Sequence, residues 1–132
     1  MQIMPATAKW IARYSGMRGY RAAHMHDVEV NVTLATRYLK RVLDRFGSPV
    51  LALTAYNAGP TRAQRWRDAE PLEGAIYTET IPFPETRDYV KKVMSSAVFY
   101  SVLLHDTTEP LKQRLGIVTG RDSPRRSGKR GR

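Results

Sequence analysis

The segment between Asp27 and Phe46 restricts the possible folds more than any other part of the sequence. Its apolar residues recur at intervals of three and four, the spacing that places side chains on one face of an α-helix, and charged residues occupy the other face. Asp27 can cap such a helix by accepting a hydrogen bond from a backbone N–H, and the run Gly-Ser-Pro at 47–49 ends the pattern. The segment therefore predicts an amphipathic helix. Its apolar positions are Val28, Val32, Ala35, Leu39, Val42, Leu43 and Phe46.

Prolines and glycines divide the first half of the chain into further predicted helices. Pro5 suits the first turn of a short helix that closes near Gly16. Residues 49–56 are almost wholly apolar, a pattern shared by buried strands and buried helices, and their alanines and helical neighbours favour a helix. The run Asn-Ala-Gly-Pro at 57–60 must interrupt it, because proline cannot continue a helix.

In the second half we expect a helix to restart over residues 61–68 and a long helix to span residues 85–104. Prolines and Gly74 predict a loop between them, with short irregular or extended pieces over residues 71–84. A chain of 132 residues with 42% hydrophobic side chains has the size of one ordinary domain. The predicted class is therefore a single, mainly α domain.

Cysteine and histidine usage argues against a metal or cofactor site. The chain has no cysteine, which excludes disulfides and thiolate ligands. Its three histidines are His24, His26 and His105, and the first two would point to different faces of a helix. We therefore expect no metal and no cofactor.

The net charge of +10 is concentrated at the C-terminus. Residues 111–132 hold eight Lys or Arg and one Asp, whereas residues 1–110 hold 14 basic and 11 acidic groups. Almost no apolar residue follows Val118. Such a composition predicts a disordered basic tail over residues 119–132, after a connecting segment at 105–118.

The apolar runs are too short to predict a membrane-spanning helix, which needs roughly 20 residues. The first residues also lack the basic-then-apolar order of a signal peptide. We therefore expect neither a transmembrane segment nor a signal peptide in this chain.

Three short segments, in a fixed order, carry a more specific signal than the helical pattern. They are MQIMP at 1–5, AYNAGP at 55–60 and ETIPFPETRDYV at 79–90. Together they resemble the catalytic domain of the soluble lytic transglycosylases, and the resemblance covers residues 1–104. It implies a lysozyme-like helical fold, here as the partial domain 1–104.

The resemblance also implies that the domain is N-terminally truncated. In the family the MQIMP segment follows a helix that bears the catalytic glutamate, so that glutamate is expected upstream of Met1, which would be an internal methionine. The family cleaves the β-1,4 bond between N-acetylmuramic acid and N-acetylglucosamine without hydrolysis, leaving 1,6-anhydromuramic ends. One glutamate serves as both acid and base, a departure from the usual pair of carboxylates.

The resemblance implies roles for five residues of this chain. Tyr56 would lie near the catalytic acid and steady developing charge. Gln2, Met4, Asn57 and Glu79 would line the same sugar-binding groove, Gln2 and Asn57 through their amides and Glu79 from the opposite side. This chain would thus bind peptidoglycan but lack its proton donor.

Each of these residues also has an ordinary structural interpretation. Met4 is typical of a helix core, Tyr56 of a buried tyrosine with a satisfied hydroxyl, Asn57 of a helix end and Glu79 of a surface carboxylate. Asp27 and Glu29 do not replace the missing acid, because the start of a helix favours their ionised form.

Two other function classes stay open at this stage. The basic tail could bind nucleic acid or an anionic surface, since clustered Arg and Lys give sequence-independent phosphate affinity. Outside the tail no nucleic-acid binding is expected. A purely structural helical adaptor is a weaker alternative. The resemblance favours a lyase of the cell wall, located in the periplasm or cell envelope in its full-length form.

Overall fold

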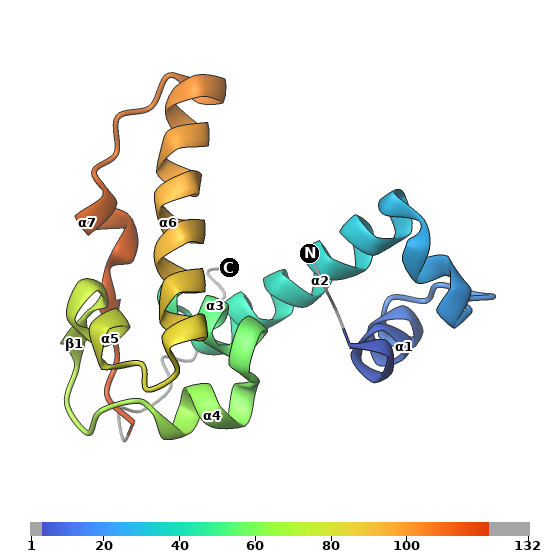
Figure 1. Cartoon of the computed structure of the whole chain (residues 1–132), viewed down its shortest axis with the longest axis horizontal. Helices are drawn as coiled ribbons and strands as arrows, with labels where there is room; N and C mark the ends of the chain where they lie inside the picture. Colours follow the sequence, from blue (N-terminus) through green and yellow to red (C-terminus); the bar gives the residue numbers. More distant parts are fainter. Residues whose placement is uncertain (1–3, 122–132) are drawn as a thin grey trace, which may run out of the picture.

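The computed structural model describes residues 4–121, and these form a mainly α structure. Its path is shown in Figure 1. The α-helices are α1 (Pro5–Tyr14), α2 (Val28–Phe46), α3 (Pro49–Ala58), α4 (Pro60–Arg65), α5 (Gly74–Thr80), α6 (Pro84–His105) and α7 (Leu111–Leu115); a 3-10 helix, η1 (Ala22–His26), precedes α2, and two short strands are β1 (Leu72–Glu73) and β2 (Ile117–Val118). The predicted helical class is confirmed.

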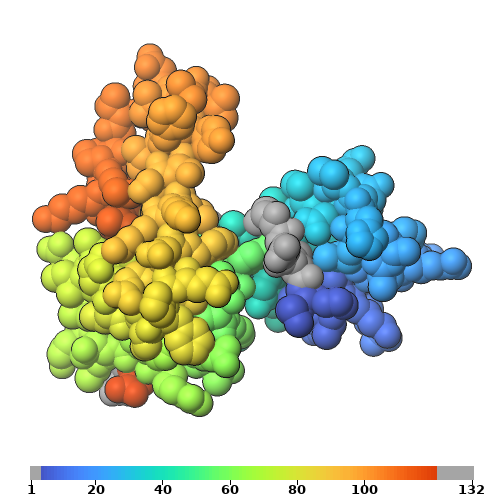
Figure 2. All heavy atoms as spheres, in the orientation of Figure 1, coloured from blue at the N-terminus to red at the C-terminus, as the bar shows by residue number. Residues whose placement is uncertain are grey.

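Helix α2 connects two parts of the molecule. Its C-terminal half packs on α3, which lies in a body formed by α3 to α7, whereas its N-terminal half extends to α1 and η1 (Figure 1). Figure 2 shows that the surface between these two parts is recessed. Each part has its own apolar cluster: Leu34 of α2 packs with Ala8, Ile11 and Ala12 of α1, and the larger cluster surrounds α3.

Helix α2 has the predicted bounds but a narrower buried face. The Asp27 carboxylate accepts a hydrogen bond from the Val30 N–H over 3.1 Å, and Gly47 ends the helix with a positive φ of 69°. The residues buried along it are Leu34, Ala35 and Val42. Val28 and Val32, by contrast, are 77% and 48% exposed. The apolar repeat therefore predicts the helix correctly but not the full extent of its buried face.

Helix α3 forms the centre of the larger cluster. The Ser48 hydroxyl accepts a hydrogen bond from the Leu51 N–H, Pro49 occupies the first turn, and residues 50–55 are all buried. The choice of helix over strand for this apolar run is confirmed. The helix ends where Gly59 adopts a φ of 96°, which a residue with a side chain rarely adopts.

The predicted loop over residues 71–84 is wrong for its central part. Residues 74–80 form α5, which buries Tyr77 and Thr78. Gly74 permits the start of α5 to lie close to Leu115, because a Cβ atom at this position would lie 2.2 Å from the Leu115 carbonyl oxygen. The β-branched side chains within residues 74–80 favour an extended backbone locally. The burial of Tyr77 in the helix outweighs that preference.

The residues after α6 return to the body rather than leaving it. Strand β2 pairs antiparallel with β1, Leu72 opposite Val118. The Arg67 guanidinium donates to the carbonyl oxygens of Thr119 and Gly120 and to the Thr119 hydroxyl at 2.7–3.0 Å. The Arg121 N–H donates to the Asp68 carbonyl oxygen. The sequence predicted disorder from residue 119, but residues 119–121 contact the body through these hydrogen bonds. The rest of the predicted tail lies outside the described residues.

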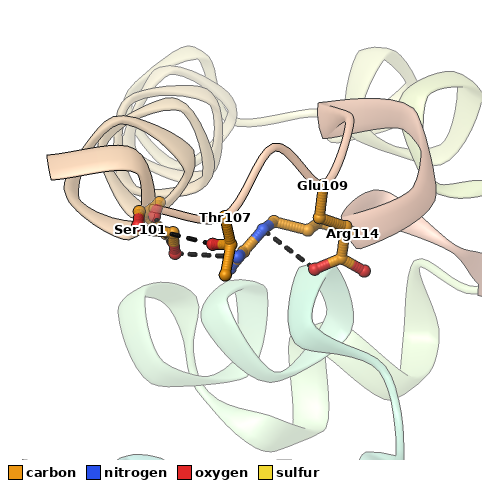
Figure 3. A network of polar contacts seen from close by, with 5 residues as sticks. Ser101, Thr107, Glu109 and Arg114 are labelled. Carbon is orange, nitrogen blue, oxygen red and sulfur yellow. Dashed lines mark hydrogen bonds and ion pairs between the residues drawn. The ribbon is translucent and has the colours of Figure 1, made fainter. Parts of the chain in front are cut away.

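Helix α7 is also joined to the end of α6 by polar contacts (Figure 3). Arg114 donates from Nη2 to the Ser101 hydroxyl over 2.7 Å, and its Nε lies 3.2 Å from the Glu109 carboxylate. These contacts fix the connection between α6 and α7. The division of the chain at residues 104 and 118 stays a prediction. Of the helices in the described range 4–121, none is long and apolar enough to cross a membrane.

Candidate functional site

Tyr56 lies in a cluster of three tyrosines from three helices, here called the tyrosine cluster. Its ring centroid is 5.5 Å from that of Tyr38 on α2 and 6.4 Å from that of Tyr89 on α6, and the Tyr56 and Tyr89 rings are nearly parallel. Helix α3 therefore holds the Tyr56 ring between α2 and α6.

The Tyr56 hydroxyl is buried and has no hydrogen-bond partner among the described residues. Burial, together with the neighbouring hydroxyls of Tyr89 and Tyr38, raises the pKa of Tyr56 to about 12. The hydroxyl is therefore protonated at neutral pH and can donate a hydrogen bond. Burying a hydroxyl without a hydrogen-bond partner is unfavourable. The Tyr56 hydroxyl is therefore suited to form a hydrogen bond with a ligand or with another polar group that enters the site.

Asn57 follows Tyr56 in the AYNAGP segment, and its side chain is fixed by a residue of the ETIPFPETRDYV segment. Its Oδ1 accepts a hydrogen bond from the Thr86 hydroxyl over 2.7 Å. Thr86 is 2% exposed, whereas Asn57 is exposed. The sequence therefore brings AYNAGP and ETRDYV together at one place, where the end of α3 meets the start of α6.

Glu79 lies on α5 and forms an ion pair with Lys91 of α6. A small hollow of about 120 Å³ beside it is lined by residues of α5, α6 and α7, and its lining does not include Tyr56 or Asn57. Glu79 is thus held by its own polar contact with α6, and neither this ion pair nor the hollow beside it includes Tyr56 or Asn57.

Of the two remaining predicted site residues, Met4 is 73% exposed at the N-cap of α1, and Gln2 lies outside the described residues. The structure therefore joins Tyr56 and Asn57, which are neighbours in sequence, but no hydrogen bond, ion pair or ring contact among the described residues links them to Met4 or Glu79. A single groove lined by all five residues stays a prediction.

Three residues beside Tyr56 and Asn57 were missed by sequence reasoning as site residues. Tyr89 and Thr86 lie within the ETRDYV segment, so their place in the motif was an available signal. Tyr38 lies four residues after the buried Leu34 on α2, and only its helical spacing could have indicated it.

A larger hollow of about 620 Å³ lies between α1 and α2. Trp10 and Tyr14 stack with ring centroids 5.7 Å apart, and the Arg41 guanidinium lies over both rings at 4.6 and 4.4 Å. Trp10 is 45% exposed, so its ring contacts Arg41 and is also accessible to solvent.

Within residues 4–121, no three His, Asp or Glu side chains are grouped as metal ligands would be. Asp27 caps α2 and Glu79 pairs with Lys91. The Tyr56 hydroxyl and the Asn57 amide are groups that can form hydrogen bonds with a ligand.

Comparison with known protein families gives two matches. Residues 1–76 match the family model described as the transglycosylase SLT domain, and residues 80–108 match the soluble lytic transglycosylase helical domain. The gap between the two matches, residues 77–79, lies within α5.

The sequence is also similar to curated proteins. It is 36% identical over 110 residues to the soluble lytic murein transglycosylase of Escherichia coli K12, covering 80% of this chain and 17% of that protein. It is 38% identical over 104 residues to that of Salmonella typhimurium, covering 76% of this chain and 16% of that protein. The chain thus spans less than a fifth of the length of these relatives.

Two solved structures share the fold. The inactive glutamate-to-glutamine mutant of lytic transglycosylase Slt from Pseudomonas aeruginosa aligns with a TM-score of 0.77 at 42% identity, over 84% of this chain and 18% of that one. The 70 kDa soluble lytic transglycosylase of Escherichia coli aligns with a TM-score of 0.74 at 33% identity, over 88% of this chain and 19% of that one. The expected lysozyme-like helical fold is confirmed by these neighbours.

Proposed function

The chain belongs to the soluble lytic transglycosylase family, and on this premise we propose that it forms the glycan-binding part of a peptidoglycan lytic transglycosylase. The substrate would be the β-1,4 bond between N-acetylmuramic acid and N-acetylglucosamine. The products would be a free N-acetylglucosamine end and a 1,6-anhydromuramic end. In the full-length protein this activity belongs in the periplasm or cell envelope.

The observation that carries this proposal is the buried Tyr56 hydroxyl without a partner among the described residues. A protonated hydroxyl in a half-buried aromatic setting can donate a hydrogen bond to a carboxyl group or to oxygen that gains charge during bond cleavage. Its raised pKa keeps it a donor throughout the neutral range. Tyr56 would therefore support an acid rather than act as one.

The general acid and base is proposed to be a glutamate upstream of Met1. Within residues 4–121, Asp27 is engaged as a helix cap and Glu79 as the partner of Lys91. The inactive state named for the glutamate-to-glutamine mutant of the Pseudomonas aeruginosa relative supports the need for a glutamate. That carboxyl group would first protonate the glycosidic oxygen and then remove the proton from the muramoyl 6-hydroxyl.

Gln2, Met4, Asn57 and Glu79 are proposed to contact the glycan. The Asn57 amide is exposed and fixed by Thr86, and the Glu79 carboxylate is accessible beside Lys91. Amides and carboxylates of this kind suit the hydroxyl and acetamido groups of the two sugars.

The test uses purified peptidoglycan and chromatographic detection of 1,6-anhydromuramoyl products. The 132-residue chain should release none, because a missing general acid costs about 10²- to 10⁴-fold in rate and here one group makes both proton transfers. An extended chain, with the in-frame coding sequence upstream of Met1, should release them. Product release by the 132-residue chain at a similar rate would contradict the proposal.

Binding by the tail is not supported as the main function, since the relatives and structures described above are all lytic transglycosylases. The residues 122–132, which hold most of the predicted tail, lie outside the described residues.

A further inference from the structure

A side-chain hydrogen bond connects the AYNAGP segment at 55–60 with the ETIPFPETRDYV segment at 79–90. The Thr86 hydroxyl, in the first turn of α6, donates to Oδ1 of Asn57 near the end of α3. The two residues are 29 positions apart. Because Thr86 is buried and Asn57 is exposed, the bond fixes a surface amide from inside the protein.

This bond decides which end of the Asn57 amide faces outward. The amide has an oxygen that accepts hydrogen bonds and an NH₂ group that donates two. The first turn of α6 has backbone N–H groups without partners inside the helix and the positive end of the helix dipole. Its N-cap residue, Phe83, provides no side-chain cap. The amide oxygen is therefore favoured on the α6 side, which leaves the NH₂ group directed away from α6.

We propose that Thr86 is a positioning residue that holds the Asn57 amide so that its NH₂ group donates to the acetamido carbonyl oxygen of a bound sugar. The inference rests on the proposed function, since both sugars of the peptidoglycan backbone are N-acetylated. An acetamido group offers a carbonyl oxygen as an acceptor. The protonated amine of a de-N-acetylated sugar offers only donors, which would face the Asn57 NH₂ group. Thr86 and Asn57 together select for N-acetylated glycan.

The experiment measures binding of the 132-residue chain to two soluble probes of equal length, a chitin tetrasaccharide and its de-N-acetylated counterpart. The wild-type chain should prefer the N-acetylated probe. Thr86→Val keeps the shape of the side chain but removes the hydroxyl, and it should reduce that preference by about five- to tenfold, the effect of losing one oriented hydrogen bond. Thr86→Ser keeps the donor and should restore the preference.

Thr54→Val is the matched control. Thr54 is also fully buried, but its hydroxyl donates to the Val50 carbonyl oxygen within α3 and not to Asn57. It should leave the preference unchanged. Thermal denaturation of every variant separates a change in preference from a change in stability.

A second readout follows the side-chain NH₂ signal of Asn57 by nuclear magnetic resonance. The signal should shift with the N-acetylated probe in the wild-type and Thr86→Ser chains, and not in the Thr86→Val chain. Asn57→Asp keeps the acceptor for Thr86 but removes the NH₂ group, so it should abolish the preference even if Thr86→Val fails to fold.

The outcomes separate this inference from the proposed function. If the wild-type chain binds the N-acetylated probe but Asn57→Asp or a folded Thr86→Val chain keeps the full preference, Thr86 does not act through Asn57 and the inference is overturned. If the wild-type chain does not bind the N-acetylated probe at all, the proposed function fails and the inference with it.

Discussion

At the scale of single residues, the hydroxyl of Tyr56 is the group whose role can be tested most directly. In the extended enzyme described above, Tyr56→Phe removes only that oxygen and keeps the ring between Tyr38 and Tyr89. We expect the rate of product formation to fall about ten- to a hundredfold with little change in KM, since the hydroxyl acts on developing charge. Steady-state kinetics on purified peptidoglycan measure both.

Tyr100→Phe is the control for this substitution. Tyr100 is 58% exposed on α6 and is not part of the tyrosine cluster, so its hydroxyl should not matter for turnover. An equal loss in both variants would show that Tyr56 has no special role in the reaction.

The raised pKa of Tyr56 also predicts how stability depends on pH. The tyrosine loses its proton near pH 10 in the unfolded chain and near pH 12 in the folded one, so the unfolded state binds fewer protons between these values. Its contribution to stability is therefore complete below about pH 10 and is lost as the pH rises towards 12. Urea denaturation at pH 9 and pH 11 should show a smaller decrease in Tyr56→Phe than in the wild-type chain. Equal decreases would contradict the burial of this hydroxyl.

The residue scale also shows the limits of reading a site from a sequence. Tyr56 and Asn57 could be selected because they lie in one recognisable motif, whereas their contacts with Tyr38 and Thr86 depend on how α2 and α6 pack against α3. Such contacts join residues 18 and 29 positions apart. Sequence spacing specifies neighbours within a helix, not between helices.

At the scale of elements, a substitution of Gly74 tests whether the close contact of α5 with α7 is needed for stability. Gly74→Ala would normally stabilise a helix, but its methyl group would lie 2.2 Å from the Leu115 carbonyl oxygen. We expect a loss of about 1–3 kcal/mol in the free energy of unfolding, as for other overpacked sites. Thermal or urea denaturation provides the measurement.

Gly47→Ala is the matched control at the end of α2. Its methyl group would meet nothing within 4 Å, but its positive φ imposes strain of about 1 kcal/mol. Gly74→Ala should therefore be the more damaging change, although the backbone of Gly74 is one that alanine adopts. A stabilised Gly74→Ala chain would show that α7 does not lie against α5 as described.

Elements were predicted well where local signals agreed. Helix α2 has a cap, an apolar repeat and a terminating glycine, and its bounds were predicted to within one residue. Helix α5 has neither a side-chain cap nor an acidic first turn, and prolines follow it closely. It depends on the burial of Tyr77 by other segments, so nothing local could predict it.

At the scale of the whole molecule, Arg67, which lies just after α4, connects this part of the chain with the residues beyond β2. Arg67→Ala removes its hydrogen bonds to Thr119 and Gly120 and should cost about 1.5–3 kcal/mol in stability, the range for hydrogen bonds to a charged group. Amide hydrogen exchange at Val118 should accelerate more than exchange within α3. Arg65→Ala, at an exposed site on α4, should change neither.

The overall arrangement could be predicted only in part. The helical class and its lysozyme-like fold follow from the helical repeats and the family resemblance. The N-terminal cluster of Leu34 with α1 follows from tertiary packing alone, as does the return of residues 117–121 to the body. The basic composition after Val118 predicted a free tail, but one arginine, Arg67, holds the start of that segment through its backbone carbonyl groups.

The pairing of β1 with β2 has a consequence for the order in which the chain acquires its structure. Leu72 and Val118 must meet across the whole of α5, α6 and α7, so closing this loop loses more chain entropy than any contact within a helix. Helices form in microseconds or less, whereas distant pairings come later. During synthesis the β1 edge therefore stays without its partner until Val118 has left the ribosome. We expect residues 117–121 to dock late in folding, onto a body that is already helical.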